Sequence, residues 1–159
     1  MLNEIMDAVT RCLDELFEGK YAIYTDEVEQ GGELPCFFVA FLKPSEKPMI
    51  GKRAFRQHDM VIHFFQEDFQ EQGGSVERKT GLARERNEVA DTLIDGMEYI
   101  TLEDGDLLRG TDRHHQVTDD VLQFFVSYNC FVYKGRGVQE ESMETLSVLP
   151  ELKKEAKTR

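Results

Sequence analysis

The sequence predicts an α+β domain, in which an antiparallel or mixed β-sheet is flanked by two amphipathic helices. Apolar residues recur at helical spacing in residues 2–16 and again in residues 81–97, with acidic residues on the opposite side of each segment. Short apolar or alternating segments lie between the two helices and after the second one. The predicted order is helix, three strands, helix, three strands, which sets the helices apart from an antiparallel run of strands.

The segment between the helices is predicted to contain three strands. They are YAIYTDEVE (21–29), CFFVAFL (36–42) and AFRQHDMVIHFFQ (54–66). CFFVAFL is apolar on both faces, so we expect it in the middle of the sheet, covered on both sides. QGGELP favours a turn, KPSEKPMIGKR is predicted to be a projecting loop with two prolines, and the polar EDFQEQGGSVERKTG is predicted to be a mobile loop.

Three further strands are expected after the second helix, joined by tight turns. YITL is followed by the turn EDGD, and LLRGTDRHHQV is followed by TDD. The last strand runs from Val121 to Lys134. One of its faces is apolar: Leu122, Phe124, Val126, Tyr128, Cys130 and Val132. The other mixes aromatic and small polar residues: Gln123, Phe125, Ser127, Asn129, Phe131 and Tyr133.

The mixed face of this last strand has two interpretations. The protein's own helices could cover it, with one helix on each face of the sheet or with one helix lying at the sheet edge. Alternatively another chain covers it, because aromatic residues are enriched in the cores of interfaces. The sequence leaves both interpretations open.

Net charge is distributed unevenly along the chain. Residues 1–134 are predicted to form a single domain, and they contain 14 basic and 26 acidic residues, which is the whole net charge of −12. Residues 135–159 hold five basic and five acidic residues and are predicted to be a partly flexible C-terminal extension. Nucleic-acid affinity comes largely from lysine and arginine on phosphates, so an acidic body argues against gripping DNA.

The candidate catalytic groups all have simpler explanations. His58 and His63 differ by five positions and therefore point to opposite faces of a regular strand, and the adjacent His114 and His115 meet the same objection unless a bulge intervenes. We expect exposed strand histidines. The acids of EDGD and TDD, together with Asp112, fit turns better than a metal or hydrolytic site. Phosphate-loop and nucleophile-elbow patterns are not found in the sequence, so neither enzyme activity nor a cofactor is expected.

The cysteines and the apolar runs point to a cytoplasmic site of synthesis. Cys12, Cys36 and Cys130 are widely spaced among apolar neighbours, which favours buried free thiols in a reducing compartment. The apolar runs are far shorter than the roughly 20 residues of a membrane-spanning helix, and the N-terminal segment lacks the pattern of a signal peptide.

Basic residues cluster in GKRAFR (51–56) and in ERKTGLARER (77–86). Acids are interleaved in the second cluster, and pairing along a helix explains them. The first cluster is short, and by itself it supports a nucleic-acid site only weakly.

Several of these segments together resemble the tail terminator family of bacteriophages and prophages of Gram-positive bacteria. The resemblance covers residues 1 to about 134, and it is strongest in IYTDEVEQG followed by PCFF and in VLQFFVSYNCFVYK. It implies an α+β fold and a structural role. Similar proteins form a ring, typically of six copies, that caps the completed tail tube, stops polymerisation and provides the surface for the head or its connector. In contractile tails and headless bacteriocin-like particles the ring can also touch sheath subunits.

The resemblance also implies partners and a location. Six copies would carry about −72 in total, and acids lining the bore would let DNA pass without specific binding. The protein would be made in the host cytoplasm and would reside in the virion tail, with no membrane contact. Another ring protein of the head–tail junction, which would bind the connector rather than the tube, stays open as an alternative. A small enzyme or nucleotide-binding domain is a more remote one.

Six residues are predicted to contact the tube or a neighbouring subunit. They are Phe125, Phe131, Tyr133, Lys52, Arg53 and Arg56. We expect the mixed face of the last strand to be covered partly by a helix of its own chain and partly by a neighbour in the ring.

Overall fold

A computed structural model describes residues 1–25, 33–66 and 76–135. The chain forms two compact units. The first, which we call the helix-covered unit, comprises Met1–Ser45 and Gln57–Asn129. The second, which we call the small-sheet unit, comprises Glu46–Arg56 and the chain from Cys130 onward, of which residues 130–135 are described.

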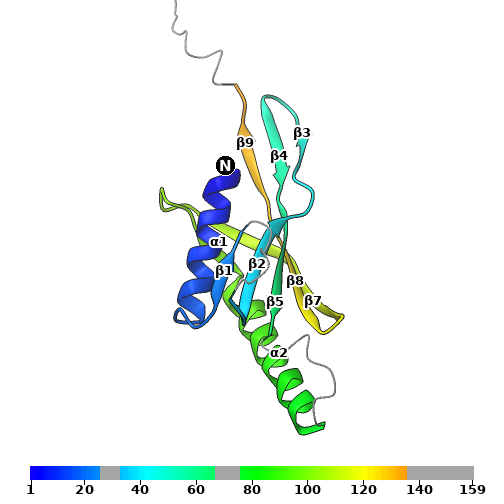
Figure 1. Ribbon diagram of the computed structural model, residues 1–159. Helices are drawn as coiled ribbons and strands as arrows, with labels where there is room; N and C mark the ends of the chain where they lie inside the picture. Colours follow the sequence, from blue (N-terminus) through cyan, green and yellow to red (C-terminus); the bar gives the residue numbers. More distant parts are fainter. Residues whose placement is uncertain (26–32, 67–75, 136–159) are drawn as a thin grey trace, which may run out of the picture. The chain divides into compact units, whose positions relative to one another are not determined.

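The helix-covered unit contains two helices and a six-stranded sheet, so the predicted α+β class is confirmed (Figure 1). The helices are α1 (Leu2–Leu16) and α2 (Val76–Gly96). The strands are β1 (Ala22–Tyr24), β2 (Cys36–Phe41), β5 (Asp59–Phe65), β6 (Tyr99–Thr101), β7 (Leu107–Thr118) and β8 (Val121–Tyr128). Their order is β1-β2-β5-β8-β7-β6, with β1 parallel to β2 and the other pairs antiparallel.

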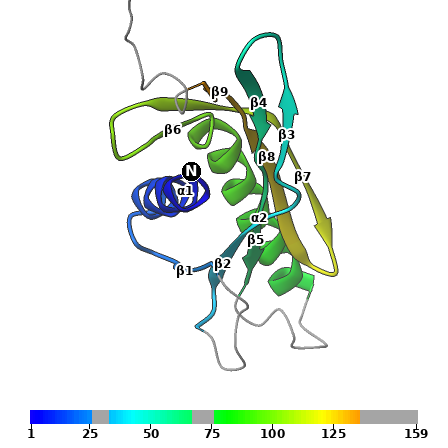
Figure 2. The ribbon, with the colours of Figure 1, turned by 90° about the horizontal axis from the view of Figure 1, so that it is seen from above.

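Both helices lie on the same face of this sheet (Figure 2). The ring of Phe17, just after α1, packs 5.0 Å from the ring of Phe37 in β2, and the Tyr128 hydroxyl of β8 donates to the carbonyl of Met97, just after α2. The covered face is therefore the apolar face of β8, where Leu122, Phe124, Val126 and Tyr128 are buried. The expectation that a helix covers the opposite, Phe125-bearing face is wrong.

The central position predicted for CFFVAFL is only partly right. β2 lies inside the sheet, between β1 and β5, and Phe37 and Val39 are fully buried beneath the helices. Phe38 points to the other face and is half-buried, because neither of the two described helices covers that face.

The predicted tight turns join β6 to β7 and β7 to β8. Gly105 has a φ of +94°, and the amide of Asp106 donates to the Asp104 carboxylate. Asp119 and Asp120 both have positive φ, as a two-residue hairpin turn requires. Asp112, also at positive φ, lies in an irregularity of β7 between Thr111 and His114.

The small-sheet unit is a three-stranded sheet in the order β3-β4-β9. Its strands are β3 (Ser45–Pro48), β4 (Arg53–Gln57) and β9 (Cys130–Tyr133). The projecting loop predicted for KPSEKPMIGKR is therefore wrong. The segment forms β3 and a tight turn instead, in which Gly51 has a φ of +78° and the Met49 amide donates to the Arg53 carbonyl.

Two predicted strands are each divided in the structure. The strand at 54–66 is interrupted at His58, and the strand at 121–134 is interrupted at Asn129. His58 is 3% exposed, so the expectation of an exposed histidine is wrong there, whereas His114 and His115 are exposed as expected. The described chain therefore contains five strands before α2 rather than three.

Several predicted segments lie partly or wholly outside the described residues. Helix α2 begins at Val76, five residues before the predicted start, so part of the predicted mobile loop is helical. The rest of that loop (67–75), part of the QGGELP turn and of the strand before it (26–32), and the C-terminal extension after Gly135 lie outside the described residues. Within the described ranges, neither helix combines the length and apolar character needed to cross a membrane.

Candidate functional site

One face of the small sheet gathers exposed aromatic and basic side chains. Arg53 pairs with Tyr133 and Phe55 with Phe131 in the β4–β9 register, so these four side chains share one face, which we call the basic-aromatic face. The rings of Phe55 and Phe131 lie 5.0 Å apart, and the Arg53 guanidinium carbon lies 5.9 Å from the Phe131 ring. Phe131 is 59% exposed and Tyr133 is 67% exposed, which is high for aromatic residues.

The opposite face of the small sheet, which we call the polar face, carries paired charged side chains next to the buried Ala54. One carboxylate oxygen of Glu46 lies 2.8 Å from Nε of Arg56, and the other lies 2.6 Å from Nζ of Lys134. The hydrogen bonds from Lys134 and Arg56 lower the pKa of the Glu46 carboxyl. Arg56 is therefore engaged within its own sheet and does not share the face of Arg53.

Lys52 and Tyr133 lie close together around Gly135. A Cβ atom at Gly135 would come within 2.5 Å of Lys52 Cδ and 2.7 Å of the Tyr133 ring. The Lys134 amide donates to the Lys52 carbonyl at 2.6 Å. Glycine at this position lets the two side chains approach the backbone, which places a lysine beside the exposed tyrosine.

A second candidate surface is the open face of the six-stranded sheet, opposite the helices. Phe125 lies here, half-buried, with its ring stacked 4.8 Å from the ring of His114. The His63 ring lies 5.8 Å from Phe38 and 6.0 Å from Phe65. Burial among these groups lowers the pKa of His63, so the neutral imidazole is favoured on this surface.

This open face is shallowly hollowed beside Phe125. A depression of about 530 Å³ is lined by residues of β5, β7, β8 and the segments next to them, including Leu42, Asp59, His114 and Ser127. Inside it the Ser127 hydroxyl donates to the Asp59 carboxylate. Ser127 and Asp59 are thus paired with each other, while the Phe125 ring contributes apolar surface.

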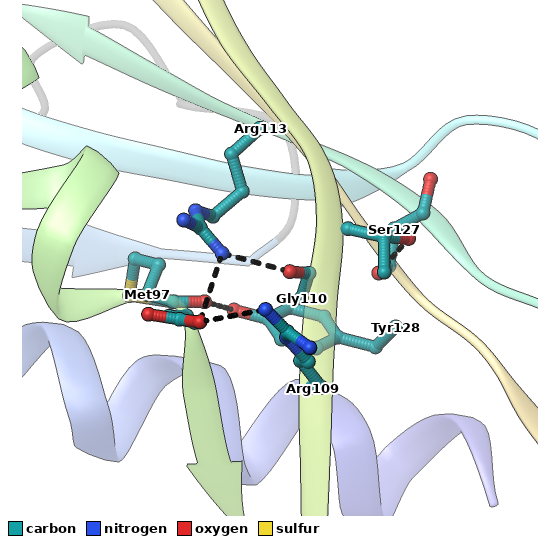
Figure 3. Close-up of polar contacts among 8 residues, drawn as sticks. Met97, Arg109, Gly110, Arg113, Ser127 and Tyr128 are labelled. Atoms are coloured by element: carbon teal, nitrogen blue, oxygen red, sulfur yellow. Dashed lines mark hydrogen bonds and ion pairs between the residues drawn. The ribbon is translucent and has the colours of Figure 1, made fainter.

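A polar cluster fixes β7 and β8 to the end of α2 (Figure 3). The Tyr128 hydroxyl donates to the Met97 carbonyl at 2.7 Å, and Arg113 donates to the Gly110 carbonyl at 2.9 Å. Glu98 lies 3.2 Å from Arg109 and 3.9 Å from Arg113. Burial raises the pKa of Tyr128, which therefore stays protonated and acts as a donor.

A second cluster joins β5 to β8 at the place where β5 begins and β8 ends. Nδ1 of His58 lies 2.7 Å from the Tyr128 carbonyl, a contact that requires Nδ1 to carry the proton and donate. The His58 amide donates to the side-chain oxygen of Asn129 at 3.1 Å, and the Tyr128 amide donates to the His58 carbonyl at 3.0 Å. His58 and Asn129 thus serve a structural role at the ends of these strands.

The groups considered for chemistry lie apart or serve the backbone. Among the described residues, no three His, Cys, Asp or Glu side chains lie together in a way that could hold a metal ion. Cys12, Cys36 and Cys130 are free thiols, as predicted, although only Cys36 is fully buried. Burial raises the pKa of all three.

The six predicted contact residues divide between the two units. Phe125 belongs to the helix-covered unit, whereas Phe131, Tyr133, Lys52, Arg53 and Arg56 belong to the small-sheet unit. Two further residues of the site were not predicted from the sequence: Phe55, which contacts Phe131, and Glu46, which pairs with Arg56 and Lys134. Phe55 lies two residues from Arg53 and therefore on the same face of a strand, a spacing that could have identified it.

This arrangement defines a class of protein. Many of the described polar groups serve turns, strand junctions and surface pairs, and the unusual feature is exposed or half-exposed aromatic surface on one sheet face of each unit. Such a distribution is typical of a protein that assembles with other chains.

The particular family follows from sequence comparison. Residues 4–140 match the family model of the phage tail terminator protein, and the chain belongs to that family. It is therefore a structural protein of phage tails, and its partners are other tail or head proteins. A comparison with curated proteins gave no match.

Proposed function

We propose that this protein caps the end of the completed tail tube as a ring, typically of six copies, and so stops tube polymerisation. The same ring provides the surface to which the head or its connector attaches. The observation that carries this proposal is the family match over residues 4–140, which spans the helix-covered unit and the described part of the small-sheet unit.

The distribution of exposed side chains supports an assembly role. Each unit has an exposed face with aromatic residues, which are the residues enriched in the cores of interfaces. Phe131 and Tyr133 are candidates for contact with tube or neighbour on the small sheet, and Phe125 is the candidate on the open face of the large sheet. Lys52 and Arg53 add positive charge beside the first two.

The net charge supports a ring through which DNA passes without being bound. A chain with a net charge of −12 adds negative charge to a ring through which DNA passes, and repulsion at close range favours passage over binding. We propose that tail sheath and connector proteins, where present, contact the outside and the head-facing side of the ring.

The test is to mix purified protein with assembled tail tubes and to observe them by negative-stain electron microscopy and co-sedimentation. Binding at one end of each tube, with tube length fixed afterwards, is the expected result. Capture by purified connectors or capsids without binding to tubes would assign the protein to head–tail joining instead. Binding along the whole tube would contradict capping.

A further inference from the structure

The two units of the chain carry opposite net charge. The helix-covered unit contains nine basic and 25 acidic residues, which gives a formal net charge of −16. In the small-sheet unit, residues 46–56 and 130–135 hold five basic residues and one acidic residue. Glu46, the one acid, lies between Arg56 and Lys134 on the polar face. Arg53 on the basic-aromatic face and Lys52 beside it have no carboxylate partner among the described residues.

From this asymmetry we infer that the basic-aromatic face docks on the acidic helix-covered unit of a second copy of this chain. The inference rests on the proposed function, because it specifies the contact that would close the ring. A cyclic ring is built from head-to-tail contacts, in which one patch of each subunit meets a different patch of the next. A chain with one basic and one acidic unit satisfies that requirement with its own charges.

The side chains of the basic-aromatic face suit a protein partner. Phe131 and Tyr133 offer apolar area that is more than half exposed, and Arg53 lies over the Phe131 ring. Aromatic residues and arginine dominate the binding energy of many interfaces. Exposed carboxylates for Arg53 and Lys52 are present in α2, at Glu88 and Asp91, and in the β6–β7 turn, at Asp104 and Asp106.

Charge also favours a second copy over DNA as the occupant. One arginine and one lysine at this face would neutralise few phosphates, and the remainder of the chain repels DNA. Contact between copies places the two positive charges against a unit of net charge −16 instead.

Photo-cross-linking tests the inference directly. Tyr133 is replaced by p-benzoylphenylalanine in isotopically light protein, which is mixed with heavy protein over a range of concentrations, with and without tail tubes. Cross-links between light and heavy chains can arise only between copies, and mass spectrometry identifies the residues joined. The expected result is light–heavy cross-links from position 133 to residues 1–45 or 57–129 of another copy.

Charge variants give the matched comparison. Arg53→Glu should reduce the light–heavy cross-links about tenfold or more, because like charges placed opposite each other in an interface are strongly unfavourable. Lys79→Glu makes the same change at an exposed position of α2, within the acidic unit, where an added negative charge should not lower the yield. Salt at about 1 M, where the screening length is about 3 Å, should also lower the yield.

Cross-links from position 133 only to tube protein or only to DNA would overturn the inference. It would also be overturned if no light–heavy cross-links formed at any concentration or at capped tube ends. Tube binding is scored separately in the same samples. Capped tubes without light–heavy cross-links would refute this inference and leave the proposed function standing. Light–heavy cross-links without capping would refute the proposed function and leave the contact between copies standing.

Discussion

The two sheets of this protein use the same kind of strand in different ways. In β8 the alternating apolar residues are buried, because both helices pack on that face. In β9, one residue further along the chain, Phe131 and Tyr133 are more than half exposed. The comparison teaches that alternation indicates a strand, whereas burial depends on which elements cover each face. It also suggests a division of roles, in which the large sheet holds the fold and the small sheet serves assembly.

The largest expected loss of stability comes from truncating a phenylalanine of the large sheet, and the same truncation in the small sheet is its control. Phe124→Ala should destabilise the protein by about 3–5 kcal/mol, because the ring is fully buried beneath the helices. Phe131→Ala, the matched control, should change the stability by less than about 1 kcal/mol, since that ring is 59% exposed. Urea denaturation followed by circular dichroism measures both. A large loss for Phe131→Ala would make this ring part of the core.

A pair of glycine variants tests the packing of β7 against β8 and the end of α2. A Cβ atom at Gly110 would lie 2.7 Å from both the Met97 carbonyl and Val126, and 3.0 Å from the Tyr128 ring. Gly110→Ala should therefore destabilise the fold by about 1–3 kcal/mol.

Gly81→Ala is the control for this packing test. Gly81 lies within α2, and a Cβ atom added there would have no neighbouring atom within 4 Å, so alanine should be neutral or stabilising by up to about 1 kcal/mol. Thermal denaturation compares the two variants. Equal effects of the two substitutions would contradict the close approach at Gly110.

A substitution at the junction of β5 and β8 should have a smaller effect on stability, together with a local effect on hydrogen exchange. Asn129→Ala removes the acceptor of the His58 amide and should destabilise the protein by about 1–2 kcal/mol, because a donor in a buried residue loses its partner. Hydrogen exchange at the His58 amide should become faster. Asn87→Ala, at an exposed position of α2, serves as the control. Unchanged exchange at His58 would show that the Asn129 side chain does not protect this amide.

The smallest expected effect is the pH dependence at the open face. Burial lowers the pKa of His63 in the folded state, so the unfolded chain takes up a proton first as the pH falls. The contribution of His63 to stability should be constant above the ordinary histidine pKa of about 6.5 and should decrease as the pH drops through the lower folded value.

Urea midpoints between about pH 7.5 and about pH 5, a range that brackets the ordinary histidine pKa, measure this dependence. His63→Gln should flatten the decrease, and His115→Gln, at an exposed position, should leave it unchanged. An identical pH profile for wild type and His63→Gln would contradict the role of His63.

The sequence predicted the large sheet and its helices well, because periodicity reports directly on covered faces. The stripe Ile5, Val9 and Leu13 identified α1, and EDGD and TDD identified the hairpin turns. It failed for the small sheet. Pro44, Pro48 and Gly51 are typical of loops, and the short strand β3 is fully exposed, so it has no burial pattern to detect.

The breaks at His58 and Asn129 could not be predicted for a different reason. Apolar and polar residues keep alternating through Asn129, and the polar run Arg56–Asp59 contains no glycine or proline to mark a break. Both interruptions depend on hydrogen bonds between residues 70 or more positions apart. For the same reason the sequence placed Phe125 and Phe131 on one face, whereas they belong to different sheets. Phe131, Tyr133, Lys52 and Arg53 nevertheless belong to one unit, and their role as contact residues stays a prediction.

The most direct measurement of the division between the two sheets is tube capping by the double variant Phe131→Ala, Tyr133→Ala. Its unfolding midpoint in urea is measured first, and its binding to tube ends is then scored by electron microscopy against wild type. We predict a midpoint close to that of wild type together with loss of capping. A folded variant that caps tubes as well as wild type would contradict the assembly role of the small sheet.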